Sequence, residues 1–108
     1  MEIKLHTQHV ELSDERKIYF LEKFEKVTHF AARLSDESTE MKVDLIHQPS
    51  KKHEDAFECH LTIFVPHDTL RAEAHSDSLE NAVDEVIEKI KAQIERYKNK
   101  EHHISERH

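Results

Sequence analysis

The apolar positions of this chain repeat with a period of two in some segments and of three to four in others. Alternation of apolar and polar residues predicts strands over residues 2–8, 39–47 and 55–65, and a short fourth strand around residues 70–74. In the third segment, the apolar residues that share odd positions are Phe57, Cys59, Leu61, Ile63 and Val65. Each predicted strand therefore presents mainly one apolar face.

Two longer segments have helical spacing. The first begins after Ser13, a suitable N-cap, and runs to about Ala32, and the second begins after Ser76 or Ser78 and runs to about Lys98. Their apolar stripes consist of Phe20, Phe24, Val27, Ala31 and Leu34, and of Leu79, Val83, Val86, Ile90, Ile94 and Tyr97. Residues 99–108 have no such pattern, and we expect them to form a mobile tail.

The element order is β-α-β-β-β-α, which predicts an α+β fold with a four-stranded mixed sheet. Three successive strands favour antiparallel neighbours, whereas the first strand reaches the second through a helix and is expected to pair with it in parallel. Because each strand has mainly one apolar face, both helices should cover the same face, in two layers. The length of 108 residues fits a single domain, which we place at residues 1–98.

Composition excludes several classes of protein. The chain has no glycine, so it has neither a Walker loop nor a dinucleotide-binding fingerprint. Its single cysteine allows no disulfide framework, as expected of a protein in the reducing cytoplasm. No apolar run approaches the ~18–20 residues of a membrane span, and residues 1–4 do not resemble a signal peptide.

The sequence also indicates no catalytic or metal centre. Eleven histidines are present, but neither His6 with His9 nor the histidines of the tail have a cysteine partner or metalloprotease spacing. Cys59 falls on the apolar face of its strand, so we expect a small core residue rather than a nucleophile. We therefore expect no enzyme, no metal and no cofactor.

The net charge of −7 argues against nucleic acid as a partner unless the positive charge is concentrated on one surface. Projection at about 100° per residue shows such a concentration on each helix. One flank of the first helix carries Tyr19, Lys23, Lys26, Phe30 and Arg33, and one flank of the second carries Lys89, Gln93, Arg96 and Lys100. Acidic residues occupy the opposite flanks.

A structural explanation of these flanks must be weighed first. Bases near a helix C-terminus complement the macrodipole, and long cations beside a buried stripe cover its edge. The basic flank of either helix, taken alone, is explained equally well as a solvated face or as an RNA-binding surface. Two helices on one sheet face, each with a basic flank, favour an RNA-binding surface, although the sequence does not show whether the flanks meet.

Several stretches resemble the ribosome hibernation-promoting factors, also called ribosome-associated inhibitor or ribosomal subunit interface proteins. Residues 10–13 (Val-Glu-Leu-Ser) are similar to that family's entry to its first helix. Residues 23–27 (Lys-Phe-Glu-Lys-Val), followed by Arg33, are similar to its Lys-Phe-x-Lys-Leu core. The segments similar to its fourth strand and second helix are residues 72–74, 82–84, 88–89 and 93–98.

The resemblance implies a short-form hibernation factor that binds 16S rRNA of the small ribosomal subunit at the subunit interface. Such a protein blocks the tRNA and mRNA sites and inhibits translation under stress or in stationary phase. It is cytoplasmic, takes no small-molecule substrate and is expected to be monomeric when free. The RNA-binding residues that carry over are Lys23, Lys26, Arg33, Lys89, Arg96, Lys98 and Lys100, with Lys17 as a further candidate. Glu80 and Glu95 depart from the family pattern and dilute the charge of the second helix.

Two other functions stay open at this point. A generic double-stranded RNA-binding domain usually needs a basic start to its last helix, whereas residues 76–88 are acidic here. A protein-interaction module would use the acidic faces, and the basic flanks would be incidental. The sequence does not decide whether single or paired ribosomes are stored, when the protein is made, or what the tail does.

Overall fold

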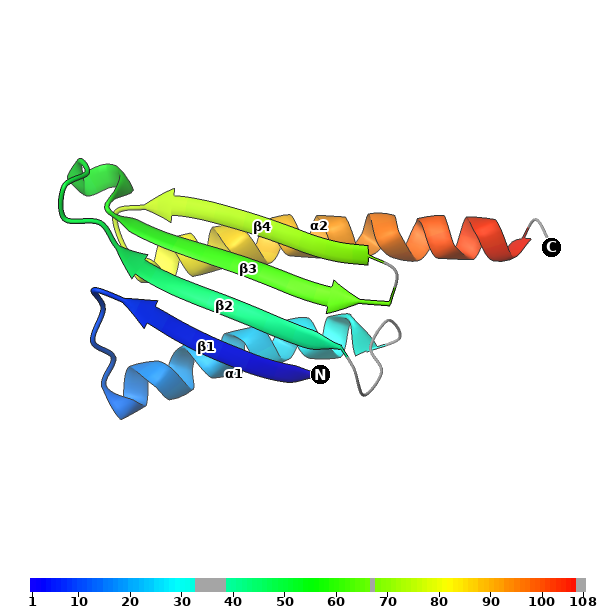
Figure 1. The fold of residues 1–108 in the computed structure, drawn as a ribbon, viewed down its shortest axis with the longest axis horizontal. Coiled ribbons are helices and arrows are strands. Elements are labelled where there is room, and N and C mark those ends of the chain that lie inside the picture. The colour runs from blue at the N-terminus through cyan, green and yellow to red at the C-terminus, as the bar shows by residue number, and fades with distance from the viewer. Residues whose placement is uncertain (33–38, 67, 107–108) are drawn as a thin grey trace.

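The computed structural model describes residues 1–32, 39–66 and 68–106, with side chains up to residue 99. The elements are β1 (Glu2–Gln8), α1 (Asp14–Phe30), β2 (Glu40–His47), η2 (His53–Asp55), β3 (Phe57–Val65), β4 (Asp68–Ser76) and α2 (Leu79–Glu106). The strands form one sheet in the order β1-β2-β3-β4, and both helices lie behind it (Figure 1). The predicted two-layer α+β fold is confirmed.

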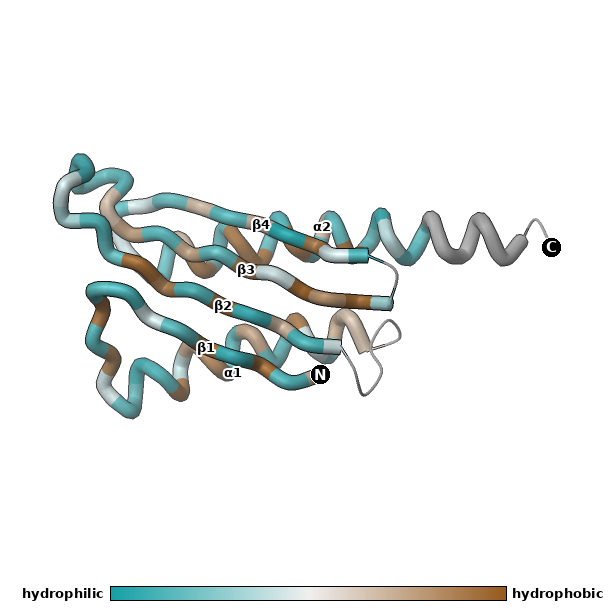
Figure 2. Tube along the Cα trace, viewed as in Figure 1, coloured by the Kyte–Doolittle hydropathy of each residue, from teal (hydrophilic) through white to brown (hydrophobic). Residues whose placement is uncertain are grey.

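The strand pairing follows from the connections. β1 pairs in parallel with β2, with Ile3 opposite Met41, because α1 carries the chain back between them. β2 with β3, and β3 with β4, are antiparallel neighbours. The alternation of hydropathy along the strands is visible in Figure 2.

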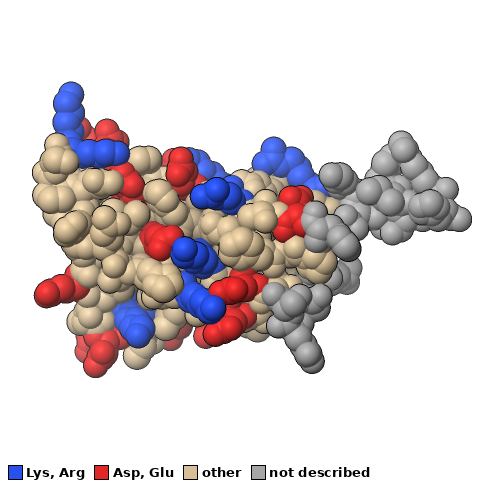
Figure 3. Space-filling model, viewed as in Figure 1, with Lys and Arg blue, Asp and Glu red and all other residues tan. Residues whose placement is uncertain are grey.

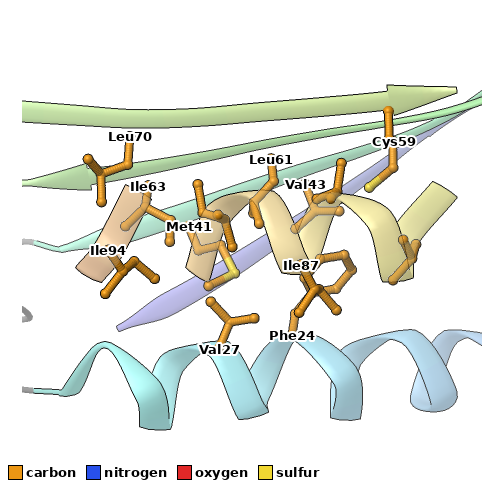
Figure 4. Packing of buried hydrophobic residues seen from close by; sticks show 14 of the residues in the cluster. Phe24, Val27, Met41, Val43, Cys59, Leu61, Ile63, Leu70, Ile87 and Ile94 are labelled. Carbon is orange, nitrogen blue, oxygen red and sulfur yellow. The ribbon is translucent and has the colours of Figure 1, made fainter. Parts of the chain in front are cut away.

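The core lies between the sheet and the two helices. Apolar side chains of the sheet point toward those of both helices (Figure 4). The largest fully buried side chains are Phe20, Phe24, Val27, Met41, Val43, Leu45, Leu61, Ile63, Val83, Val86, Ile90 and Ile94. Cys59 is also buried, and burial raises the pKa of its thiol to about 12, so it is a core residue without nucleophilic character.

Serine side chains fix where both helices begin. Ser13 Oγ accepts a hydrogen bond from the Arg16 amide at 3.2 Å, and Ser78 Oγ accepts one from the Asn81 amide at 3.2 Å. α1 ends at Phe30, close to its predicted end. α2 continues to Glu106, which corrects the predicted end near residue 98; the mobility of residues 99–108 stays a prediction. Within the described part of the chain, no helix is long and apolar enough to cross a membrane.

The face of the sheet away from the helices contains one buried carboxylate. Glu58 is 4% exposed, and its side chain is surrounded by Lys51, His60 and His75 at 2.8–3.2 Å. Burial alone would raise the pKa of Glu58, but hydrogen bonds from Lys51 and His60 and the charge of His75 outweigh it, so this pKa lies below its usual value. Glu58 therefore anchors the loop after β2 to β3 and β4.

We expect Glu58→Gln to lower the free energy of unfolding by about 1–3 kcal/mol at pH 7, because a buried charge-assisted hydrogen bond is lost. Since the folded pKa lies below the unfolded value of 4.5, the contribution is present above that value and is lost as the pH falls through the folded pKa. Urea unfolding of both proteins at pH 7 and near pH 3 measures this difference. Glu54→Gln, at an exposed site, is the control. A difference of the same size at both pH values would contradict the assignment.

Candidate nucleic-acid interface

The basic flank of α1 faces the other helix. Lys23 Nζ donates a hydrogen bond to the carboxylate of Asp84 on α2, and this bond raises the pKa of Lys23. The same Nζ lies 5.1 Å from the ring centroid of Tyr19, which is 42% exposed. Two turns before Lys23, Arg16 binds Glu80 of α2 at 2.5 Å. The predicted line on α1 therefore lies along the seam between the two helices.

A groove opens on this seam. Its volume is about 230 Å³, and its lining residues are Lys23, Lys26, Asp84, Ile87, Glu88 and Lys91. We call it the helix groove. Lys26 is exposed, whereas Lys23 and Lys91 are half-buried. Three lysines thus line one small concavity, together with two acidic residues.

Phe30 closes the end of α1 and connects the helices there. Lys98 Nζ donates to the Phe30 carbonyl at 2.9 Å and lies 4.4 Å from the centre of its ring, while Lys91 Nζ lies 5.9 Å from the same ring. A cation at this position satisfies a terminal carbonyl of α1 and complements the helix dipole. Lys98 therefore has a structural contact, and its predicted role in RNA binding stays a prediction.

The basic flank of α2 faces the edge of the sheet. Lys89 Nζ donates to the Glu73 carbonyl of β4 at 2.9 Å. The Gln93 side chain accepts a hydrogen bond from the Arg71 amide at 3.0 Å and donates one to the Arg71 carbonyl. These contacts occupy backbone groups on the outer edge of β4 and protect it from pairing with another strand.

The two basic flanks consequently lie on opposite sides of α2 and do not form one continuous surface. The flank of α2 instead continues into a second hollow, beside the loop between β2 and β3. This hollow has a volume of about 540 Å³, and we call it the edge hollow. Its lining residues are Lys51, Lys52, Asp55, Ala74, His75, Glu85 and Lys89. Arg96 lines a separate hollow of about 300 Å³ further along β4.

Lys17 does not line either cavity. Lys17 is exposed on α1, and it is turned about 120° from Lys23 around the helix, away from the seam. Arg33 lies outside the described residues, as does the side chain of Lys100.

Sequence reasoning missed two cations of the seam, Arg16 and Lys91. Lys91 follows Asp84 by seven residues and Ile87 by four, so helical spacing places all three on one flank of α2. Asp84 and Glu88 share this flank, so the sequence pattern predicts an acidic surface there. Among the described residues, no group of histidine, cysteine and acidic side chains is arranged to hold a metal ion.

Comparison with known proteins gives a consistent picture. Residues 3–102 match the family model described as sigma 54 modulation protein / S30EA ribosomal protein. No curated protein matches the chain. Among solved structures, the Thermus thermophilus Protein Y N-terminal domain is similar with a TM-score of 0.69 and 23% identity, covering 90% of this chain and 99% of that one. A ribosomal subunit interface protein from Coxiella burnetii is similar with a TM-score of 0.67 and 19% identity, covering 92% and 99%. At these identities the two structures support the fold.

Proposed function

This chain belongs to the sigma 54 modulation protein / S30EA ribosomal protein family, whose members are non-enzymatic regulators that act on the ribosome, and we propose that it docks on the 16S rRNA of the small subunit through its helix layer. The observation that carries this proposal is the helix groove. It places Lys23, Lys26 and Lys91 on the face that both helices share.

The chemistry of the groove suits folded RNA. Ribosomal RNA presents irregular arrays of phosphates, which proteins recognise by shape and by charge rather than through a groove code. A concavity lined by three lysines suits a phosphate that projects from such a surface, and the exposed ring of Tyr19 beside Lys23 offers a stacking partner for a base or ribose. The groove needs no catalytic group to do this.

The carboxylates of α2 act as competitors for the same cations. Asp84 binds Lys23 and Glu80 binds Arg16, so a docking phosphate has to displace them. Exposed ion pairs of this kind contribute at most about 1 kcal/mol each. An RNA surface that contacts several of the cations at once therefore gains more free energy than breaking these pairs requires. An RNA that reaches only one cation gains too little to compensate, and we propose that this favours the ribosome over other polyanions.

The edge hollow supplies a second set of contacts on the far side of α2. We propose that Lys51, Lys52 and Lys89 bind phosphates there, on an RNA segment separate from the one in the helix groove, and that Arg96 adds a contact at its own hollow further along β4. Contacts on both sides of α2 would orient the protein on the subunit. A generic duplex-binding mode is disfavoured because the start of α2 is acidic, with Asp77, Glu80 and Asp84 near its N-terminus.

Docking at this place would block translation without any chemistry. One similar structure is described as a ribosomal subunit interface protein, which supports a position between the subunits. A protein there occupies the sites of tRNA and mRNA, so we propose that this chain inhibits translation under stress or in stationary phase. Ribosome binding implies the cytoplasm, and a monomer suffices for the proposed contacts.

Centrifugation through a sucrose gradient tests the docking directly. At low ionic strength we expect the purified protein to co-sediment with small ribosomal subunits, because several phosphate contacts form at once. We expect release at high salt, since the same contacts displace counterions. Large subunits are the control and should leave the protein at the top of the gradient. If it stays at the top with small subunits as well, the proposal is wrong.

A further inference from the structure

The face of the sheet away from both helices presents an exposed aromatic ring beside a row of cations. Phe64 of β3 is 43% exposed, although it lies on a central strand. In the neighbouring row, Thr62 of β3 is paired with Lys42 of β2 and with Arg71 of β4, and both cations are exposed. Residues two apart on a strand point to the same face and are separated by about 7 Å. Phe64, Thr62, Lys42 and Arg71 thus form one surface, which we call the sheet platform.

The charges around the platform are arranged in bands. Lys4 of β1 is paired with Lys42 and extends the row of cations to the edge of the sheet. Glu40, the partner of Phe64 in register, is bound by Lys4 at 2.8 Å, so the two charges of this pair offset each other and Lys42 and Arg71 are the main cations of the row. Asp44 lies one row away, on the opposite side of the cations from Glu40. Figure 3 shows this face with Lys and Arg side chains near its middle and acidic side chains to either side. A positive strip therefore crosses the sheet of an acidic protein.

A polar hollow adjoins the row of cations. Its volume is about 380 Å³, and its side-chain groups come from His60, Thr62, Arg71 and Glu73. An imidazole, a hydroxyl and a carboxylate provide donors and acceptors for the edge of a base or for a 2′-hydroxyl. The ring for stacking, the cations for phosphates and the polar hollow thus lie within a few residues of one another.

We propose that the sheet platform binds a single-stranded RNA segment, with one base stacked on Phe64 and phosphates held along the row from Lys4 to Arg71. Single strands fit because their bases are free to stack, whereas those of a duplex are not. The row spans three strand spacings, or about 14 Å. Asp44, one row away, repels phosphates and so favours the row of cations as the path of the backbone. This function goes beyond docking through the helix layer, since the platform lies on the opposite layer and would hold a second RNA segment.

Titration of the isotope-labelled full chain with a short single-stranded oligouridine, followed by NMR, tests this proposal. We expect the largest shifts at the amides of β3 and β4 near Thr62, Phe64 and Arg71. Phe64→Ser should weaken binding about five- to tenfold through the lost stacking. Lys42→Glu combined with Arg71→Glu should weaken it about tenfold and make the remaining binding less dependent on salt.

Matched variants separate this effect from misfolding. Ile18→Ser removes an apolar side chain that is 56% exposed on α1, and it should leave oligouridine binding unchanged. Phe64→Tyr keeps the ring and should keep the affinity. Shifts confined to α1 and α2, or unchanged binding by Phe64→Ser, would overturn the proposal. The proposal would also be overturned if the native protein self-associates with rising concentration and Phe64→Ser does not. A second copy of the chain, and not RNA, would then cover this face. No ribosome enters the titration, so its outcome is independent of small-subunit docking.

Discussion

Reversal of the three lysines of the helix groove, Lys23→Glu, Lys26→Glu and Lys91→Glu, is expected to abolish co-sedimentation with the small ribosomal subunit. Each reversal removes one proposed phosphate contact and adds a repulsive charge at the same place. Close pairs of like charge cost several kcal/mol, so the combined loss of affinity should exceed about 100-fold. The corresponding change to glutamine at the three positions removes the contacts without the repulsion and should give an intermediate loss.

Single reversals on one helix provide the control. Lys17→Glu changes the net charge by the same amount as Lys23→Glu, but Lys17 is turned away from the helix groove. We expect a loss of about tenfold or more for Lys23→Glu and less than twofold for Lys17→Glu. Thermal unfolding should change little in Lys17→Glu. Lys23→Gln, which removes the ion pair with Asp84 without adding a like charge beside it, should also keep the thermal stability within about 1 kcal/mol and shows whether the loss of binding is separate from folding. Equal losses for Lys23→Glu and Lys17→Glu would show that net charge, and not the groove, determines binding.

The sequence was sufficient to predict the fold because its periodicities are unambiguous. Cys59, Leu61 and Ile63 fall on one side of a period-two pattern, and all three are buried. The starts of both helices were predictable without glycine as a marker, because Ser13 and Ser78 are suitable N-caps and both cap their helix in the structure. The end of α2 was predicted too early because the apolar stripe stops at Tyr97, whereas the helix continues to Glu106 without one.

The site was only partly predictable from the same patterns. Helical projection gives the angle of each residue around its own axis, so the basic flanks of both helices were found. It does not reveal which neighbour each flank faces. In the structure Lys23 contacts the other helix, whereas Lys89 contacts the edge strand β4. Lys91 was missed because Asp84 and Glu88 share its flank of α2, and its place in the groove becomes visible only when α1 lies beside α2.

Lys98 illustrates a further limit of sequence reasoning. Its position on a basic helix end and its place in the family pattern both indicate a residue available to RNA. Its ammonium group is instead held by the carbonyl and ring of Phe30, which the sequence places 68 positions away. A lysine that caps a helix C-terminus and a lysine that is available to bind a phosphate have the same sequence pattern. Tertiary contacts alone distinguish them.

Neutralising the acidic partners of the groove, with Asp84→Asn and Glu80→Gln together, is expected to tighten binding to the small subunit about tenfold to thirtyfold. Both carboxylates hold a cation of the seam, and both are well exposed, with 57% and 42% of their side chains accessible. Their removal leaves Lys23 and Arg16 available to phosphate and relieves repulsion of the RNA. Titration of small subunits with labelled protein at fixed salt measures the gain.

The control for net charge is Glu2→Gln with Glu54→Gln, two exposed carboxylates away from the seam, for which we expect a gain below about threefold. The double variant of the groove should also bind tRNA and duplex RNA more tightly than the native protein, and by a larger factor than it gains on the ribosome. A poorly fitting RNA contacts few cations, so competition from the two carboxylates removes a larger share of its binding free energy than it removes from the binding free energy of the small subunit. Weaker binding of the small subunit by the groove variant would mean that Asp84 and Glu80 contact the partner directly. A gain that is equal for every RNA would mean that they set affinity alone and contribute nothing to the choice of partner.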